Sequence, residues 1–310
     1  SDTTLEPDTA MELIGAMLHP LNRAVVGKRR KIVKEGSGII QPRVSVSLEA
    51  ANKSDFTRIF AGRGGTDPYG GTVSDVYQDI FGRGSFNGKG IIDVEAYYEC
   101  LDDRFPENTI LSHDLLEGAY LHCSYMGECE LTDGYPYKVT SYYDRMHRWV
   151  RGDWQTIPWL GRKVKNANGE TIENPISEID KWKIADNLRR SLTPVFTFAA
   201  IVTGMFTSGQ DFAWACFIAI LSAVSALLIS SADLALRHDD ELKLRYQSTV
   251  VSGFAGCFLQ TVIRLIFLPY EAWTAFSAIV TALYRMTVSH KNMLSWVTAA
   301  ETEKKTKGKW

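Results

Sequence analysis

The chain has 310 residues, of which 45% are hydrophobic and 23% charged, so it can form one large domain or two ordinary ones with a sizeable core. Its formal net charge of −2 implies no domain-wide basic surface, which argues against a nucleic-acid partner. The five cysteines include no Cys-x-x-Cys pair, which argues against both a disulfide framework and a structural zinc site.

The N-terminal part of the sequence is typical of a soluble domain. The first residues, SDTTLEPDTAMELIG, lack the segments of a signal peptide and an initiating Met, so we expect the chain to begin inside a larger protein. Up to Arg190, short apolar runs punctuated by Gly, Pro and Asp predict a mixed α/β order. Residues 6–21 have helical apolar spacing with Pro20 as a stop, and the β-branched alternation of residues 33–48 predicts one or two strands.

A glycine-rich stretch, FGRGSFNGKGIIDVEAYY, occupies residues 81–98 and leads into a helix that we expect Asp93 to cap. Its glycines expose backbone amides that can approach a sugar or a phosphate. The spacing matches no phosphate-loop signature, however, so a tight structural turn is an equally good interpretation.

The most informative group is Ser112-His113-Asp114. We expect a short strand over residues 109–111 to lead into it, and a helix to begin at Asp114. At a helix N-terminus the dipole and the free amides favour an anionic carboxylate. Asp114 is therefore a candidate site residue, with simple capping of the helix as the alternative.

A second group of chemically active side chains lies in YYDRMHRWVRGDW, residues 142–154. Arg145, Arg148 and Arg151 recur at every third residue, so on a helix they form a basic stripe with Trp149 beside it. Such a stripe can bind phosphate, or it can be a solvated face with the tryptophans packed beneath it.

Beyond Arg190 the sequence becomes strongly apolar. Residues 192–207 and 212–236 are two apolar runs joined by the polar tetrapeptide SGQD, which predicts an antiparallel transmembrane hairpin. Lys and Arg lie on both outer flanks and not in the connection, so the positive-inside rule places both flanks in the cytoplasm. A buried helix pair of a globular protein is the alternative.

Residues 250–286 are harder to interpret. The run is apolar but contains Gln260, Arg264 and Pro269, so it predicts either a second spanning hairpin or a pair of interfacial amphipathic helices. We favour spanning or re-entrant segments, followed by a cationic cytoplasmic tail.

The order of these groups resembles that of processive, membrane-bound inverting glycosyltransferases of the cellulose- and hyaluronan-synthase kind. Those enzymes carry an Asp-x-Asp metal motif, a Thr-Glu-Asp base motif and a Gln-x-x-Arg-Trp motif before their membrane helices. In detail, residues 67–118, HRWVRGDWQTIPWL and MLSWVTAA resemble the glycosyltransferase family 84 region of cyclic β-1,2-glucan synthases. The likeness covers nearly the whole chain.

The resemblance implies roles for two carboxylates. Asp2 matches the second carboxylate of an Asp-Ser-Asp motif that holds Mg²⁺ or Mn²⁺, with the first Asp upstream of residue 1. Asp114 matches the catalytic base, although Ser112-His113 replace Thr-Glu and His113 is expected to contact the acceptor differently.

The resemblance also divides the basic stripe into roles. Arg148 and Trp149 match the Arg-Trp pair, which implies that Arg148 binds the donor diphosphate and that the acceptor sugar stacks on Trp149. Arg145 stands where related synthases have Gln and cannot copy the hydrogen bonding of that amide. We assign it to the donor diphosphate as well.

By this resemblance, residues 1–190 form the C-terminal portion of a GT-A-type catalytic domain, 191–236 a transmembrane hairpin, and 237–310 membrane or interfacial helices and a cytoplasmic tail. The implied enzyme is a multi-pass protein of the bacterial inner membrane that transfers glucose from UDP-glucose to a growing β-1,2-glucan with inversion. The nucleotide-binding half is absent from this chain, and relatives add cyclisation and phosphorylase-like domains. A synthase of another linkage and a noncatalytic membrane scaffold or transport component are the alternatives.

Overall fold

A computed structural model describes residues 3–61, 75–236 and 254–296. The strands are β1 (Val25–Val26), β2 (Val33–Glu35), β3 (Ile39–Val46), β4 (Ile91–Ile92), β5 (Cys123–Asp133), β6 (Lys163–Lys165) and β7 (Thr171–Glu173). The α-helices are α1 (Pro7–Leu18), α2 (Leu48–Ala51), α3 (Asp55–Phe60), α4 (Val76–Phe81), α5 (Val94–Leu101), α6 (Asp114–Leu121), α7 (Val139–Gln155), α8 (Glu178–Thr207), α9 (Gly209–Leu236) and α10 (Phe254–Tyr284). Short helical turns cover Pro20–Asn22, Ile157–Leu160 and Arg285–Ser289.

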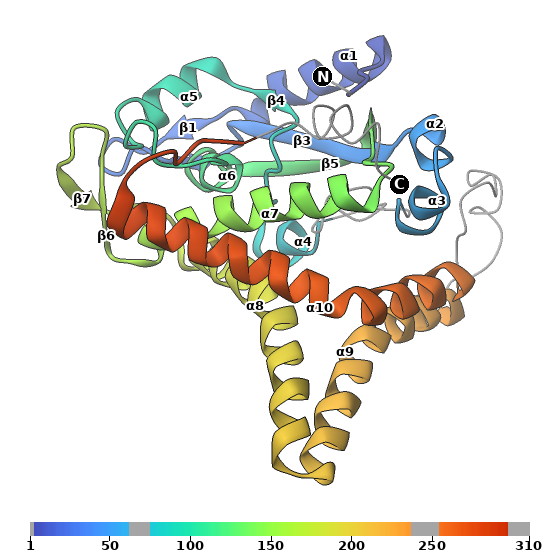
Figure 1. Ribbon diagram of the computed structural model, residues 1–310. Coiled ribbons are helices and arrows are strands. Elements are labelled where there is room, and N and C mark those ends of the chain that lie inside the picture. Colours follow the sequence, from blue (N-terminus) through green and yellow to red (C-terminus); the bar gives the residue numbers. More distant parts are fainter. Residues whose placement is uncertain (1–2, 62–74, 237–253, 297–310) are drawn as a thin grey trace.

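The expected mixed α/β architecture is confirmed, with a body built around a small sheet. Helix α1 lies on one side of strands β3 and β5, and α7 followed by α10 lies on the other side (Figure 1). Helices α8 and α9 form a hairpin that extends from the α10 side away from the body (Figure 1).

Strand β3 is the centre of a three-stranded sheet with the order β4-β3-β5. It pairs antiparallel with β4 and parallel with β5, from Ile39 opposite Cys123 to Val46 opposite Asp133. A parallel pair needs a long crossover connection, and this connection contains the glycine-rich turn, α5 and α6. The topology therefore brings the glycine-rich turn and the start of α6, the two segments that carry candidate site residues, to the same part of the body.

The sequence predicted several local elements correctly and one wrongly. Helix α1, strands β2 and β3 and the capping of α5 are confirmed, the last by a 3.0 Å bond from the Ala96 amide to Asp93 Oδ1. The strand expected over residues 109–111 is absent from the described structure. There the Leu111 amide donates to Gln155 Oε1 of α7 at 2.7 Å, so a side chain takes the place of a neighbouring strand.

The predicted hairpin geometry is present, although its boundaries differ from the expected ones. Only Ser208 separates α8 from α9, and α8 already begins at Glu178 in the body, with Pro194 inside it. The large apolar side chains exposed on the hairpin are Phe196, Met205, Phe206, Trp214, Phe217 and Ile218. Such a surface suits lipid. That the hairpin crosses a membrane stays a prediction.

Helix α10 is a single helix, so the expectation of two segments around Pro269 is wrong. Its alanines at positions 272, 275, 278 and 282 are buried, and the helix packs along α7 and the base of α8 and α9. This continuous close packing keeps the helix intact through the proline. Within the described residues, 258–289 are the one helical stretch whose length and composition are sufficient to cross a membrane.

A buried lysine connects α8 to the glycine-rich turn. Lys183 is 1% exposed, and its Nζ donates to the carbonyls of Arg83 and Gly84 at 3.0 and 2.8 Å. Arg83 in turn pairs with Asp180 of α8 at 2.8 Å. The start of α8 and the start of the turn are therefore held as one unit.

Replacing Lys183 by Met is expected to lower the free energy of unfolding by about 2–4 kcal/mol, because two buried carbonyls lose their donor. Denaturation of the purified protein measures the change. Lys181→Met is the matched control, since the partner of Lys181 within the described residues is the exposed Glu178, and it should cost less than about 0.5 kcal/mol. Equal losses in the two variants would contradict the anchoring role of Lys183.

Candidate functional site

The glycine-rich turn between α4 and β4 is fixed at several points before it reaches the site. Its Ser85 amide donates to Asp75 Oδ2 at 3.0 Å, and its Asn87 amide donates to Gln41 Oε1 at 2.6 Å. Asp75 and Gln41 are both fully buried. The turn is thus a rigid loop supported by the start of α4 and by strand β3.

Gly88 brings this turn directly against Asp114. Its φ is +89°, a conformation that L side chains rarely adopt, and a Cβ added there would lie 3.0 Å from the Asp114 carboxyl carbon and from Oδ1. The turn therefore forms one wall over the carboxylate. Glycine is required both by the backbone conformation and by this close approach.

Asp114 is the first residue of α6, and its carboxylate does not cap the helix. Instead Oδ2 accepts a 3.0 Å hydrogen bond from Ser112 Oγ. Burial raises the pKa of Asp114 above its ordinary value, against the hydrogen bond from Ser112 and the positive charges of His113 and Arg148.

Helix α7 closes the other side of this carboxylate. A Cβ added to Gly152 would lie 3.1 Å from Ser112 Cβ, so the glycine allows α7 to approach Ser112 closely. The same helix carries Arg148, whose charge acts on Asp114. Burial and then the neighbouring Arg145 lower the pKa of Arg148, against the charge of Asp114.

The other residues of the basic stripe separate in space. The Arg145 guanidinium lies over the Trp149 ring, 4.5 Å from its centroid, so a cation covers one face of this tryptophan. Arg151 is buried and donates from Nη2 to the Ser295 carbonyl at 2.6 Å. The idea of a uniformly solvated basic face is therefore wrong.

The segment after α10 was missed as part of this region. Trp296 stacks on Arg148, with 4.6 Å from the guanidinium carbon to the ring centroid, and Gln155 donates to the Met293 carbonyl at 3.2 Å. The similarity of MLSWVTAA to the synthases was the only signal for this segment. Its contact with α7 could not be predicted from spacing.

Asp153 and Trp154 connect α7 to α8. Asp153 accepts a 3.1 Å bond from Asn187, and Trp154 donates to Ser191 Oγ at 2.9 Å, so both bind α8. Burial raises the pKa of Asp153 to about 7. These contacts fix the face of α7 that is turned away from Asp114.

Asp2, the predicted metal ligand, lies outside the described residues. Its neighbour Thr3 donates from Oγ1 to Asp133 Oδ1 at 3.1 Å, and Asp133 also pairs with Lys89 of the glycine-rich turn. Burial alone would raise the pKa of Asp133, but Lys89, Thr3 and Arg145 bring it below its ordinary value. The start of the chain is thus tied to the site, and the Asp133 carboxylate is already neutralised by a lysine.

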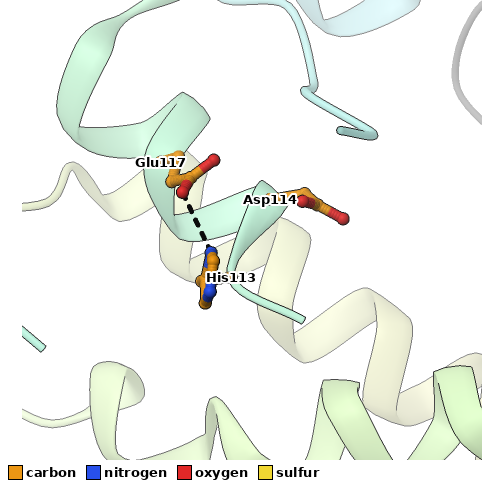
Figure 2. Close-up of side chains that lie close together, drawn as sticks. All are labelled: His113, Asp114 and Glu117. Atoms are coloured by element: carbon orange, nitrogen blue, oxygen red, sulfur yellow. Dashed lines mark hydrogen bonds and ion pairs between the residues drawn. The ribbon is translucent and has the colours of Figure 1, made fainter. Parts of the chain in front are cut away.

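His113 and Asp114 leave the first turn of α6 in different directions (Figure 2). The His113 Nδ1–H donates to Glu117 Oε1 at 2.9 Å, and this bond raises the pKa of His113. Tyr97 OH donates to the same oxygen at 3.1 Å. One nitrogen or oxygen atom from each of His113, Asp114 and Glu117 lies within 4.8 Å of the others, but the internal pairing of two of them makes this a poor metal site.

Glu117 and Tyr97 were both missed from the sequence. The i, i+4 spacing of His113 and Glu117 was a usable signal once a helix was expected to begin at Asp114. Tyr97 lies on α5 and carries no such signal.

No family model matches the chain. The chain is 40% identical over 306 residues, or 98% of its length, to the cyclic beta-(1,2)-glucan synthase NdvB of Rhizobium meliloti (strain 1021). It spans 10% of the length of that protein. Identity at this level over nearly the whole chain confirms the resemblance found in the sequence. The chain is homologous to one segment of a cyclic β-1,2-glucan synthase.

Proposed function

We propose that this chain is the acceptor-side part of a membrane-bound, inverting glucosyltransferase that builds β-1,2-glucan from UDP-glucose. The observation that carries the proposal is the Asp114 carboxylate, held between Gly88 and Ser112 with the cationic Arg148 nearby. A carboxylate with a raised pKa that keeps partial access to solvent suits a general base.

In the proposed reaction Asp114 accepts the proton of the acceptor 2-hydroxyl while that oxygen attacks the anomeric carbon of UDP-glucose. The bond from this carbon to the diphosphate oxygen breaks, UDP leaves, and the configuration inverts. Arg148, and more distantly Arg145, balance the negative charge that develops on the diphosphate. Mg²⁺ or Mn²⁺ held in part by Asp2 would supply further positive charge there.

Acceptor binding is assigned to Trp149 and His113. Because Arg145 covers one face of the Trp149 ring, the acceptor sugar is assigned to the opposite face. His113 has an exposed side chain and lies beside the base. Both residues are suited to a neutral, hydroxyl-rich ligand, with apolar contact from one and a polar contact from the other.

Residues 1–190 would be completed by an upstream nucleotide-binding half of a GT-A-type domain, and further cyclisation and phosphorylase-like domains would belong to the full protein. The relative of which this chain spans a tenth supports a much longer enzyme.

The proposed location is the bacterial inner membrane, with the catalytic part on the cytoplasmic side and several crossings. The exposed apolar side chains of the α8–α9 hairpin support lipid contact. Helix α10 lies across the base of that hairpin and exposes Phe258, Ile266, Trp273 and Phe276. This arrangement supports lipid contact of α10 as well.

Asp114→Asn in the full-length synthase is expected to reduce glucose incorporation from UDP-[¹⁴C]glucose by at least about 100-fold, because the amide cannot accept the hydroxyl proton. Membrane fractionation and UDP-glucose binding should be nearly unchanged. Asp8→Asn, which alters an exposed carboxylate on α1, is the control and should keep activity.

Three outcomes distinguish the proposed function from the alternatives. Undiminished incorporation by Asp114→Asn would refute the base assignment. A wild-type protein that inserts into membranes without incorporating any glucose would favour a scaffold or transport component. Linkage analysis of the product would identify a synthase of another linkage.

The pH dependence of transfer tests the environment of Asp114. The base must be ionised, so activity is lost as the pH falls through its raised pKa. Ser112→Ala removes a hydrogen bond that favours the ionised form, so the acid limb of kcat/KM should move to higher pH. Asp8→Asn, on the exposed side of α1, is the control and should leave the limb in place. An unchanged limb in Ser112→Ala would contradict the role of this bond.

Gly88→Ala is expected to lower the transfer rate by about 100-fold, because its Cβ would push against the Asp114 carboxyl and displace the base. Gly169→Ala is the matched control. Gly169 also has positive φ, at +79°, but an added Cβ there meets no atom within 4 Å. Denaturation should show a similar loss of stability in the two variants, and only Gly88→Ala should show a lower transfer rate. Equal rates would contradict the proposed wall.

A further inference from the structure

We propose that Glu117 is a positioning residue of this site, which fixes the His113 imidazole so that Nε2 is presented to an acceptor hydroxyl beside Asp114. The inference rests on the proposed transferase function. It assigns a role to a buried carboxylate that the reaction itself does not use.

Glu117 is buried to a degree that is unusual for its side chain. It is 6% exposed, one helical turn after His113, and its Oε1 accepts from both His113 Nδ1 and Tyr97 OH. A buried carboxylate is costly unless its hydrogen bonds are satisfied. The phenol is a dependable donor, since burial and the nearby Glu117 raise the pKa of Tyr97 to about 12.

The position of the imidazole is determined on two sides. The bond to Glu117 places the proton on Nδ1, and the Phe105 ring stacks on the imidazole with 6.2 Å between centroids and 11° between planes. Nε2 has no hydrogen-bond partner among the described residues, and the His113 side chain is 48% exposed. Nε2 is therefore the atom that a ligand can reach.

The charges around Glu117 and His113 connect the position of the imidazole to Asp114, the proposed base. Glu117 and Asp114 are both acidic and share the first turns of α6, and the charge of Glu117 raises the pKa of Asp114, while His113 on the same helix and Arg148 on α7 lower it. Among the described residues, Tyr97 on α5 is the other titratable group that hydrogen-bonds Glu117. The bond from the imidazole to Glu117 therefore offsets part of the effect of the Glu117 charge on Asp114.

The ligand that fits this arrangement is a neutral sugar oxygen. A nitrogen held at a fixed position beside the base can hydrogen-bond a hydroxyl next to the one that loses its proton. This contact would set the angle at which the reacting hydroxyl approaches Asp114. A diphosphate belongs instead to Arg148.

The test measures glucose transfer from UDP-[¹⁴C]glucose to added linear β-1,2-gluco-oligosaccharides by the full-length synthase. Glu117→Gln should raise the KM for the oligosaccharide by about tenfold and leave the KM for UDP-glucose unchanged. Glu99→Gln, an exposed position on α5, is the control and should alter neither value. Equal KM values for the oligosaccharide in Glu117→Gln and wild type would overturn the proposal.

A double-mutant cycle separates positioning from a merely structural role. If Glu117 acts through the imidazole, Glu117→Gln should add no further loss in a His113→Ala background. Independent, additive losses would overturn the inference. Tyr97→Phe, which removes only the hydroxyl that braces Glu117, should raise the same KM by a smaller factor, and it serves where Glu117→Gln does not fold.

The result for Asp114→Asn separates a failure of the proposed function from a failure of the role of Glu117. If that variant keeps its activity, the proposed function fails. If it loses activity while Glu117→Gln behaves as wild type, only the role of Glu117 fails.

Discussion

The close approach of α7 to the start of α6 is the constraint on which the rest of the site depends. Gly152 permits it, since any side chain there would meet Ser112, the residue that hydrogen-bonds the candidate base. The opposite face of α7 is fixed by Asp153 and Trp154 against α8 and by small residues of α10. The distance between the carboxylate and the guanidinium of Arg148 is thus set by packing between helices and not by an ion pair.

Charge is distributed around this contact in partly buried pairs. The charge of Arg148 acts on Asp114 without an ion pair, Glu117 accepts a hydrogen bond from His113, and Lys89 pairs with Asp133. Burial shifts the pKa of Asp114 and that of Arg148 towards the uncharged forms, so each charged group depends on its neighbours. A substitution at one group therefore changes the titration of the others, and single variants are best interpreted in pairs.

Local features were predictable and contacts between distant segments were not. The cap at Asp93, helix α1 and the helical basic stripe follow from spacing within a few residues. The strand predicted over residues 109–111 is absent because the Leu111 amide binds Gln155, which lies 44 positions away. Trp296 reaches Arg148 only through the packing of α10 on α7, and the resemblance to the synthases could mark that segment but could not place it.

The proline within α8 has a mechanical consequence. Pro194 lacks the amide that would bond the Arg190 carbonyl, so the helix is least stiff between its body-packed start and its apolar end. If the hairpin crosses a membrane as predicted, its apolar end must change its tilt in bilayers of different thickness. Bending at Pro194 would absorb that tilt before it reached Lys183 and the wall over Asp114. Catalytic geometry would then be insulated from the lipid composition of the membrane.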